Sequence, residues 1–356
     1  MKSGLNCVSL FASAGIGETY FPKAGINVIV ANELLPARAA LYQASHRKTT
    51  VIQGDITQDD VYRKIVACVG TRKVDFLLAS PPCQGFSIVG KNRTQNAISA
   101  DPRHYLLLAV IKAIKQFDPA FVLLENVPFL LKFTLDYNGK ATSVLEILKK
   151  NFKRIYDIDA RILDAADYGV PQHRNRAIIK MCKKGMDWSW PSPSSKQVTV
   201  REAIGHLPSL ESGESSGIKW HFARKHSEAN ILCMKHTPTG NTAFQNPVFY
   251  PRKADGSRTK GFESSYRRIE WDAPAPTITI RNDCISSQRN VHPGRLLPDG
   301  TFSDARVLTP LELMILDSLP TNWNIPDDTP ELLIRQCIGE SIPPKMLFEI
   351  VKGIGR

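Results

Sequence analysis

A cysteine follows two prolines in the stretch FLLASPPCQGFS, residues 76–87. Residues 74–79 (VDFLLA) read as a short buried strand, and the prolines stop that strand and stiffen the turn after it. Cys83 therefore stands just past the carboxyl end of a strand, where open α/β sheets place their chemistry. A thiolate at such a point is a nucleophile. The alternative is a small apolar side chain buried in a tight loop, the usual environment of a free cysteine.

A second group of candidate residues follows the first three expected strands. FASAGIGE (11–18) is a glycine-containing turn, which lets the backbone approach a ligand closely. Glu33 ends the second strand 18 residues after Gly15, a spacing at which an acid accepts ribose hydroxyls in dinucleotide sites. Asp55 ends the third strand, where it would meet an adenine edge. Because the GxGxxG pattern of a pyrophosphate site is absent, an adenosyl ligand without phosphates fits better, and S-adenosyl-L-methionine is such a ligand.

Strand-like and helix-like segments alternate through the first 180 residues and would position these side chains. This βαβα pattern predicts a doubly wound, mostly parallel sheet. The expected strands are 7–12, 26–32, 50–55, 74–79, 120–127 and 176–182. The expected helices run from Gly15 to about Ala24 and over 36–45, 59–70, 101–117, 143–152 and 308–320, with two more inside 330–354.

The amino-acid composition and the hydrophobic periodicity of the chain change near residue 184. From there it is richer in Pro, Ser, Gly, His and basic residues, and its periodicity is weak. We predict a catalytic and cofactor-binding domain over 1–183 and a smaller, irregular, β-rich domain over 184–275. The segment APTITI (275–280) suggests β structure. Residues 276–356 would form a hinge and return to the first domain.

The charge of the chain is positive and unevenly distributed. The net charge is +12, and residues 171–270 hold 17 Lys or Arg against 8 Asp or Glu, a local excess of 17 − 8 = +9. A solvated basic face is one explanation. A nucleic-acid partner explains both the sign and the localisation better, because phosphates are contacted mostly by such residues.

The positions of the cysteines and histidines indicate which covalent links and metal sites the chain can form. The seven cysteines are scattered and form no CxxC pair, which favours a reducing, cytoplasmic compartment over a disulfide framework or a zinc ribbon. The eight histidines form no metal-ligand pattern, so no metal site is expected. No apolar run reaches the roughly 18 residues of a membrane span, so no membrane partner is expected either.

Six sequence blocks occur in an order that carries a resemblance. They are LFASAGIGETYF (10–21), SPPCQGFS (80–87), ENV (125–127), DYGVPQHRNRAIIK (167–180), RVLTPLE (306–312) and GESIPP (339–344). Together they span nearly the whole chain, and they resemble the DNA (cytosine-5)-methyltransferases of bacterial restriction–modification systems. Three positions depart from that family's pattern. Ser13 and Ile16 replace glycines of the first turn, and Glu340 replaces an Asn of the last block.

The resemblance implies methyl transfer from S-adenosyl-L-methionine to C5 of a cytosine flipped out of double-stranded DNA, through a covalent bond between Cys83 and C6 of the ring. Glu125 would meet the charge that develops at N3. Arg176 would contact the cytosine O2, and Arg174 would support the surroundings of the nucleophile. The alternative for the two arginines is phosphate binding. Because SPP is followed by Cys rather than by an aromatic residue, methylation of a ring carbon is favoured over methylation of N4 or N6.

The implied cofactor site lies at the first turn and the strand ends that follow it. Its residues are Phe11, Ala12, Gly15, Glu33, Leu34, Asp55, Ile56 and Pro82. Residues 88–101 would form a polar loop that closes over DNA, and Arg93 would help to fill the space that the flipped base leaves in the stack.

The expected partner is double-stranded DNA, bound by a monomer whose residues 184–275 select the target sequence. A cognate restriction endonuclease, against which the methylation protects DNA, is also expected. Two alternatives stay open on sequence alone. One is a tRNA cytosine-5 methyltransferase of the same fold, and the other is a DNA-binding relative that has lost catalysis. A nicotinamide oxidoreductase is disfavoured, because its glycine pattern is missing.

Overall fold

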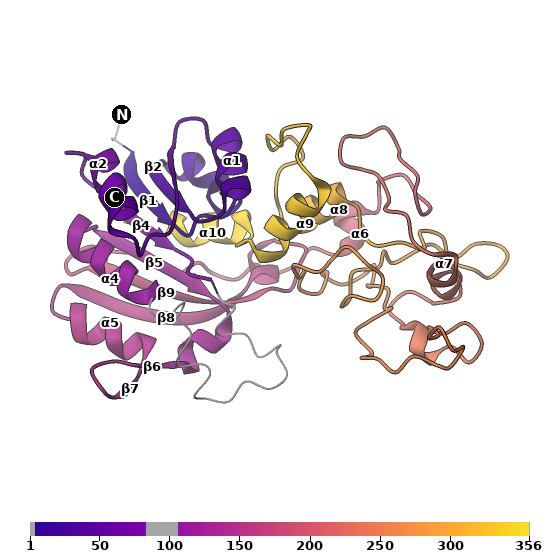
Figure 1. Ribbon diagram of the computed structural model, residues 1–356. Coiled ribbons are helices and arrows are strands. Elements are labelled where there is room, and N and C mark those ends of the chain that lie inside the picture. The colour runs from indigo at the N-terminus through magenta and orange to yellow at the C-terminus, as the bar shows by residue number, and fades with distance from the viewer. Residues whose placement is uncertain (1–3, 83–105, 356) are drawn as a thin grey trace.

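The computed structural model describes residues 4–82 and 106–355, which form two lobes (Figure 1). The larger lobe is built on one sheet with helices on both faces. The smaller lobe consists of short helices joined by long irregular segments. Cys83, Arg93 and the loop predicted at 88–101 lie outside the described residues.

The central sheet has seven strands in the order β3-β2-β1-β4-β5-β9-β8. The strands are β1 (Leu5–Leu10), β2 (Ile26–Glu33), β3 (Thr50–Gln53), β4 (Phe76–Ala79), β5 (Phe121–Asn126), β8 (Tyr156–Asp164) and β9 (Asn175–Lys183). The first five are parallel, and β9 pairs antiparallel with both β5 and β8. A separate hairpin joins β6 (Thr134–Asp136) and β7 (Ala141–Ser143). The predicted doubly wound, mostly parallel sheet is confirmed.

Helices fill most of the connections between strands. The α-helices are α1 (Pro36–Ser45), α2 (Asp59–Val69), α4 (Leu106–Phe117), α5 (Val144–Phe152), α6 (Val200–Ile204), α7 (Glu228–Lys235), α8 (Pro310–Leu316), α9 (Glu331–Glu340) and α10 (Pro344–Lys352). The 3₁₀ helices are η1 (Gly17–Ala24), η4 (Pro128–Lys132), η5 (Ala165–Tyr168) and η6 (Ala243–Gln245). Over the described ranges, none of these helices combines the length and the apolar character that crossing a bilayer requires.

Local sequence signals explain where several elements begin and end. Pro36 occupies the first turn of α1, where its missing N–H costs no hydrogen bond. Ser143 and Glu146 form a capping box at the start of α5. Gly25, with φ of 63°, ends the helix after the first turn. The helix expected up to about Ala24 is present as a 3₁₀ helix with Pro22 inside it.

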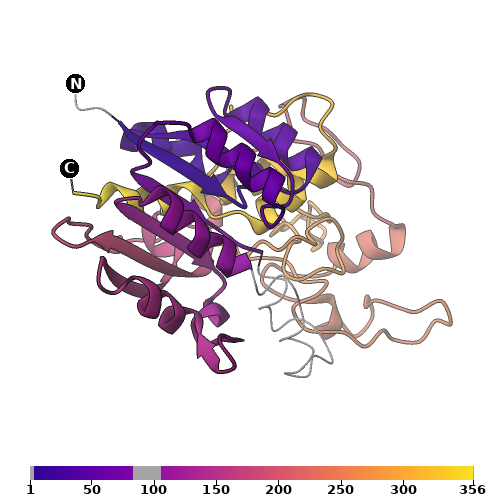
Figure 2. The same cartoon turned by 60° about the vertical axis from the view of Figure 1, so that its left-hand side comes forward.

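Two apolar layers bury the two faces of the sheet. Helices α2, α4 and α5 pack on one face, around core residues such as Leu77, Val110 and Ile147. On the other face lie η1 and α10, with Phe21 and Leu347 in one buried cluster. The last helix of the chain therefore returns to the first lobe and lies against its first helix (Figure 2).

The prediction of a β-rich smaller domain is wrong. Between β9 and residue 355, all of which is described, the chain forms no strand, and APTITI contributes only an isolated bridge at Ala275. Buried arginines bind this irregular backbone together instead. Arg268 donates to the carbonyl oxygens of Met234, His292, Ser303 and Asp304 at 2.7–3.3 Å. Weak sequence periodicity thus reflects a lobe organised by side-chain-to-backbone hydrogen bonds rather than by ladders.

The matching block RVLTPLE forms the centre of a buried charge network. Arg306 donates to both carboxylate oxygens of Glu312, at 2.8 and 2.9 Å, and to Asp304 at 2.9 Å. Glu312 also caps α8 together with Thr309. Because all these groups are buried, each charge depends on its partners. This block therefore stabilises the smaller lobe and lies outside the cavity described below.

Candidate active site

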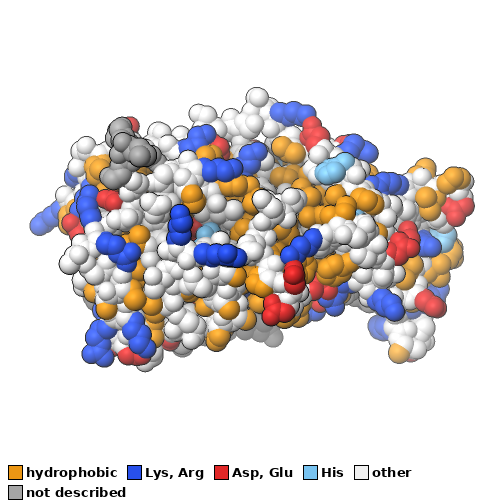
Figure 3. Space-filling model, turned by 90° about the horizontal axis from the view of Figure 1, so that it is seen from above, with side chains coloured by type: hydrophobic (Ala, Val, Ile, Leu, Met, Phe, Trp, Pro, Cys, Tyr) orange, Lys and Arg blue, Asp and Glu red, His pale blue; other side chains and the backbone are white. Residues whose placement is uncertain are grey.

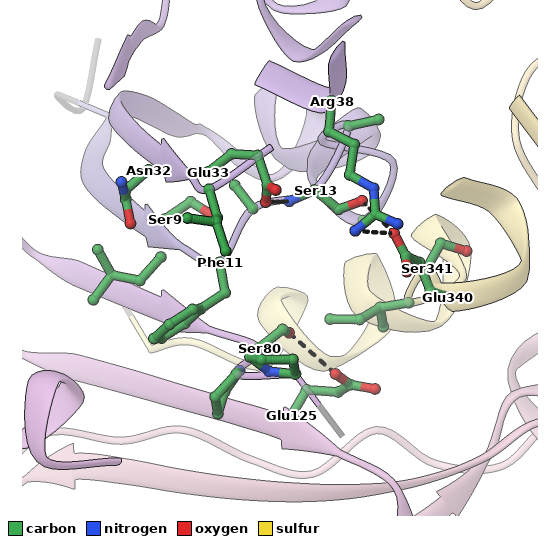
Figure 4. Close-up of a pocket in the computed structure, with 18 of the residues that line it drawn as sticks. Ser9, Phe11, Ser13, Asn32, Glu33, Arg38, Ser80, Glu125, Glu340 and Ser341 are labelled. Carbon is green, nitrogen blue, oxygen red and sulfur yellow. Dashed lines mark hydrogen bonds and ion pairs between the residues drawn. The ribbon is translucent and has the colours of Figure 1, made fainter. Parts of the chain in front are cut away.

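A cavity of about 390 Å³ opens where the parallel strands end (Figure 4). Residues that follow β1, β2, β3, β4 and β5 all line it, and so do residues of α1 and α9. The predicted site residues that line it are Phe11, Ala12, Glu33, Leu34, Asp55, Ile56, Pro82, Glu125 and Arg176. Gly15 and Arg174 do not line the cavity.

The first turn is a strained loop held against the second strand. Phe11 and Ser13 have positive φ values of 58° and 46°, and Ala12 N–H donates to the Asn32 carbonyl at 2.9 Å. Gly15 has φ of +74°, and a Cβ there would lie 2.7 Å from the side chains of His46 and Tyr42. Glycine is therefore required at this position by both backbone conformation and space.

Glu33 is fixed in the cavity wall by backbone donors. One carboxylate oxygen accepts from Ser13 N–H and the other from Leu35 N–H, both at 2.9 Å. Each oxygen keeps a further lone pair, so the carboxylate can still accept hydrogen bonds from a ligand. The burial of this acid and its position at the end of β2 are consistent with the predicted contact to ribose hydroxyls.

Asp55 and Ile56 form the wall after β3. The carboxylate of Asp55 accepts from the backbone N–H and the hydroxyl of Thr57, at 2.9 and 2.8 Å, which orients it. Behind it, Asn32 donates to the carbonyls of Ile52 and Gly54 and ties the end of β2 to this turn. Ile56 is buried and adds an apolar surface beside the acid.

Another part of the cavity wall, away from the first three strands, holds a carboxylate and a guanidinium in direct contact. Arg176 Nε lies 2.7 Å from one carboxylate oxygen of Glu125, and Ser80 Oγ donates to the other at 3.1 Å. Both charged side chains are almost fully buried. Glu125 is the second-last residue of β5 and Arg176 is the second residue of β9, so the two strands place the pair together. In this pair the carboxylate accepts hydrogen bonds and the guanidinium donates them, and both side chains line the cavity.

Asn126 fixes the turn that precedes the predicted nucleophile. Its side-chain amide donates to the Pro81 carbonyl at 2.9 Å, and its oxygen accepts from Val127 N–H at 2.8 Å. Pro81 and Pro82 both line the cavity, and Cys83 is covalently next to Pro82. The block ENV (125–127) predicts a role for Glu125 but none for Asn126.

Arg174 acts on the carboxyl-terminal segment. It is buried and donates to the carbonyls of Ile278, Gly339 and Ser341 at 2.7–3.0 Å. Full burial leaves no room for a phosphate, so the phosphate-binding alternative does not hold for this residue. The contacts hold GESIPP against the block QHRNR.

A buried acid lies in the wall behind the first turn. Burial raises the pKa of Glu18 to about 7, although a hydrogen bond from Ser9 at 2.5 Å works in the opposite direction. Both residues line the cavity. Burial behind the first turn therefore favours the neutral form of the Glu18 carboxyl more than exposure to water would.

The family model of C-5 cytosine-specific DNA methylases matches residues 5–356. The chain belongs to that family. It is 56% identical over 354 residues to the Type II methyltransferase M1.HgaI of Avibacterium volantium, covering 99% of each chain. It is 30% identical over 355 residues to the Type II methyltransferase M1.HphI of Haemophilus parahaemolyticus, covering 98% of this chain and 86% of the relative.

A solved structure has the same fold. A prophage-encoded E. coli protein, described as a DNA modification methyltransferase, superposes with a TM-score of 0.72 at 20% identity and covers 98% of each chain. The predicted enzyme class is confirmed. This DNA (cytosine-5)-methyltransferase has a DNA substrate, and its family and fold imply the use of S-adenosyl-L-methionine in general terms.

Replacing Asn126 by Ala tests whether the turn needs its hydrogen bond to Pro81. We expect the rate of methyl transfer to saturating DNA to fall about 10- to 100-fold, because a small displacement of a reacting group is costly. The rate is measured with tritiated methyl donor, and thermal unfolding serves as the control for folding. An unchanged rate in a folded variant would show that this hydrogen bond does not position the turn.

Proposed function

We propose that this enzyme methylates C5 of a specific cytosine in double-stranded DNA, with Cys83 as the nucleophile and the cavity described above as the donor site. The observation that carries the proposal is the convergence of two half-sites in one cavity. Glu33 and Asp55, whose carboxylates can accept hydrogen bonds from an adenosine, line one part of it. The Glu125–Arg176 pair lines another part.

The cavity suits an adenosyl group with an amino-acid tail. Its volume of about 390 Å³ falls within the ~300–1,000 Å³ of common small-molecule sites. Phe11, Ile56 and Pro82 supply apolar surface for a base, and Glu33 supplies acceptors for ribose hydroxyls. When bound, S-adenosyl-L-methionine supplies an electrophilic methyl group on a sulfonium.

The chemistry requires the cytosine ring to be activated first. The Cys83 thiolate would add to C6, and the electrons of the C5–C6 double bond would then be available at C5 to take the methyl group. The carbon–sulfur bond electrons of the donor stay on its sulfur. Loss of the C5 proton to water and departure of the thiolate from C6 would restore the double bond.

Glu125 and Arg176 would stabilise the ring while the thiolate is attached. A carboxyl of Glu125 that holds or shares a proton would meet the negative charge at N3. Arg176, which is always charged, would donate to the cytosine O2. The 2.7 Å contact between the two side chains supports a shared binding edge for one base. A stacked base cannot reach a cavity at the strand ends, so the target must be flipped out.

Residues 184–275 are proposed to select the DNA sequence. Within them, the hairpin over residues 250–260 (YPRKADGSRTK, called here the basic hairpin) carries four basic residues and one acid. The guanidinium carbons of Arg252 and Arg258 lie 4.3 and 4.2 Å from the ring centre of Tyr250. Elsewhere the charge is more mixed. On the face in Figure 3, Lys and Arg are spread over both lobes with acidic side chains among them.

The relatives suggest a biological role for the activity. Both curated relatives named above are Type II methyltransferases. We therefore propose that methylation by this chain, acting as a monomer on DNA, protects the DNA from a cognate restriction endonuclease. A tRNA substrate is less well supported, because the matched family is defined by DNA methylation.

Bisulfite sequencing of DNA from cells that express this chain tests the proposed activity. We expect protected cytosines at one short recurrent sequence, which would report the modified position and the recognition site together. The Cys83→Ser variant should leave no marks above background, because an alcohol is a far poorer nucleophile than a thiolate. Cys68→Ser, a change at a partly exposed cysteine on α2, is the matched control and should keep all marks. Persistent marks in Cys83→Ser would refute the assigned nucleophile, and a wild-type chain that binds DNA without marking it would indicate an inactive relative.

A change in the basic hairpin tests its contact with DNA phosphates. We expect the double variant Arg252→Ala/Lys253→Ala to bind duplex DNA more weakly. The slope of log K against log salt should become shallower by about 1.8, since each lost phosphate contact contributes about 0.9. Fluorescence anisotropy over a salt series measures this slope. Lys64→Ala, an exposed change on α2 of the other lobe, should leave it unchanged, and an equal slope in all three proteins would place DNA away from the hairpin.

A further inference from the structure

Two of the positions at which this chain departs from its family's pattern contact each other. Ser13 Oγ donates to Glu340 Oε1 at 3.0 Å, although the residues are 327 positions apart. Arg38 Nη1, on α1, forms an ion pair with the same oxygen at 2.9 Å. Arg38 belongs to none of the six matching blocks. All three side chains line the cavity.

The ion pair keeps bonding capacity that the protein does not use. Within residues 4–82 and 106–355, no hydrogen bond reaches Glu340 Oε2 or the Nε and Nη2 donors of Arg38. Each side chain is 20% exposed, so both remain accessible from the cavity. Ser13 and Arg38 hold the carboxylate in place before any ligand binds. The site therefore presents one oriented acceptor beside one oriented fork of donors.

The position of the pair matches one end of the proposed donor. In Figure 4, Phe11 and Asn32 lie on one side of the cavity, Arg38 and Glu340 lie on the other, and Glu33 lies between them. A ligand with its base near Phe11 and its ribose near Glu33 would direct its remaining tail toward the ion pair. The tail of S-adenosyl-L-methionine carries an α-ammonium and an α-carboxylate, which are the complementary charges.

We propose that Arg38 binds the α-carboxylate of the donor and Glu340 accepts its α-ammonium, with Ser13 as a positioning residue for Glu340. The inference rests on the proposed function of the same cavity. Pairing the two charges with each other avoids leaving either one uncompensated in a partly buried place. The hydrogen bonds from these two side chains to the ligand would be charge-assisted, and such bonds are roughly twice as strong as neutral ones. The acid at residue 340 accepts a hydrogen bond from Ser13 and pairs with Arg38. The departures at residues 13 and 340 are therefore joined by direct contacts.

The test compares two ligands that differ only in the amino-acid end. S-Adenosylhomocysteine has it, and 5′-methylthioadenosine keeps the adenosine and a thioether without it. Isothermal titration of the full chain should show S-adenosylhomocysteine binding about 100-fold tighter or more, as two charge-assisted contacts would give. Glu340→Gln and Arg38→Met should each lower its affinity about 10-fold or more and leave 5′-methylthioadenosine unchanged.

Control variants separate this effect from a general loss of the site. Arg47→Met removes an exposed positive charge just after α1 and should change neither affinity. Glu33→Gln should weaken both ligands, because both carry the ribose. Arg38→Met should weaken decarboxylated S-adenosylmethionine much less than it weakens S-adenosylmethionine, because the decarboxylated ligand lacks the carboxylate that Arg38 is proposed to bind. This comparison isolates the contact assigned to Arg38 even if Glu340→Gln fails to fold.

Two results would overturn the inference. If Glu340→Gln and Arg38→Met keep the wild-type ratio between the two ligands, or weaken both equally, the ion pair only joins α1 to α9. A wild-type chain that binds S-adenosylhomocysteine and 5′-methylthioadenosine equally well would show that the tail is not recognised. These outcomes leave the proposed function intact, whereas a wild-type chain that binds neither S-adenosyl compound would refute the donor site itself.

Discussion

The contact between Glu125 and Arg176 depends on the direction of one strand. In a parallel sheet the carboxyl ends of the strands meet at one edge, and β1 to β5 follow this rule. Strand β9 runs the other way, so its first residues, not its last, lie at that edge. Arg176 at the start of β9 can therefore contact Glu125 at the end of β5. Reversal of one strand thus brings Arg176 to the edge of the sheet at which Glu33 and Glu125 lie near the ends of parallel strands.

The two ends of the chain close this cavity together. Helix α10 packs against η1, and Arg174 binds three carbonyls of the segments around Ile278 and Ser341. These contacts hold α9 beside the first turn, so that Glu340 can reach Ser13. In the proposed function, the part of this cavity beside the first three strands binds the methyl donor, and the part beside Glu125 binds the target base. Methyl transfer requires two reactants in one place, and the orientation that such a cavity provides can contribute a large part of the rate.

Much of the first lobe could be predicted from the sequence, because its signals are local. Strand β2 and helix α1 have bounds close to those expected, since apolar runs, Pro36 and Gly25 mark them. Strand β8 was missed because its charged residues at alternate positions resemble a surface segment, and it is an edge strand. The smaller lobe was wrongly expected to be rich in strands, because nothing in one sequence shows which carbonyls Arg268 will bind. For the same reason the contact of Ser13 with Glu340 could not be foreseen.

The central claim is that the thiolate of Cys83 becomes bonded to C6 of the target cytosine during methyl transfer. Duplex DNA with 5-fluorocytosine at the methylated position tests it directly, because fluorine cannot leave C5 as a proton does and the bonded complex cannot resolve. With S-adenosyl-L-methionine present, the account predicts a stable protein–DNA complex whose peptide, identified by mass spectrometry, is linked through Cys83. No linked complex, or one linked through a different cysteine, would contradict it.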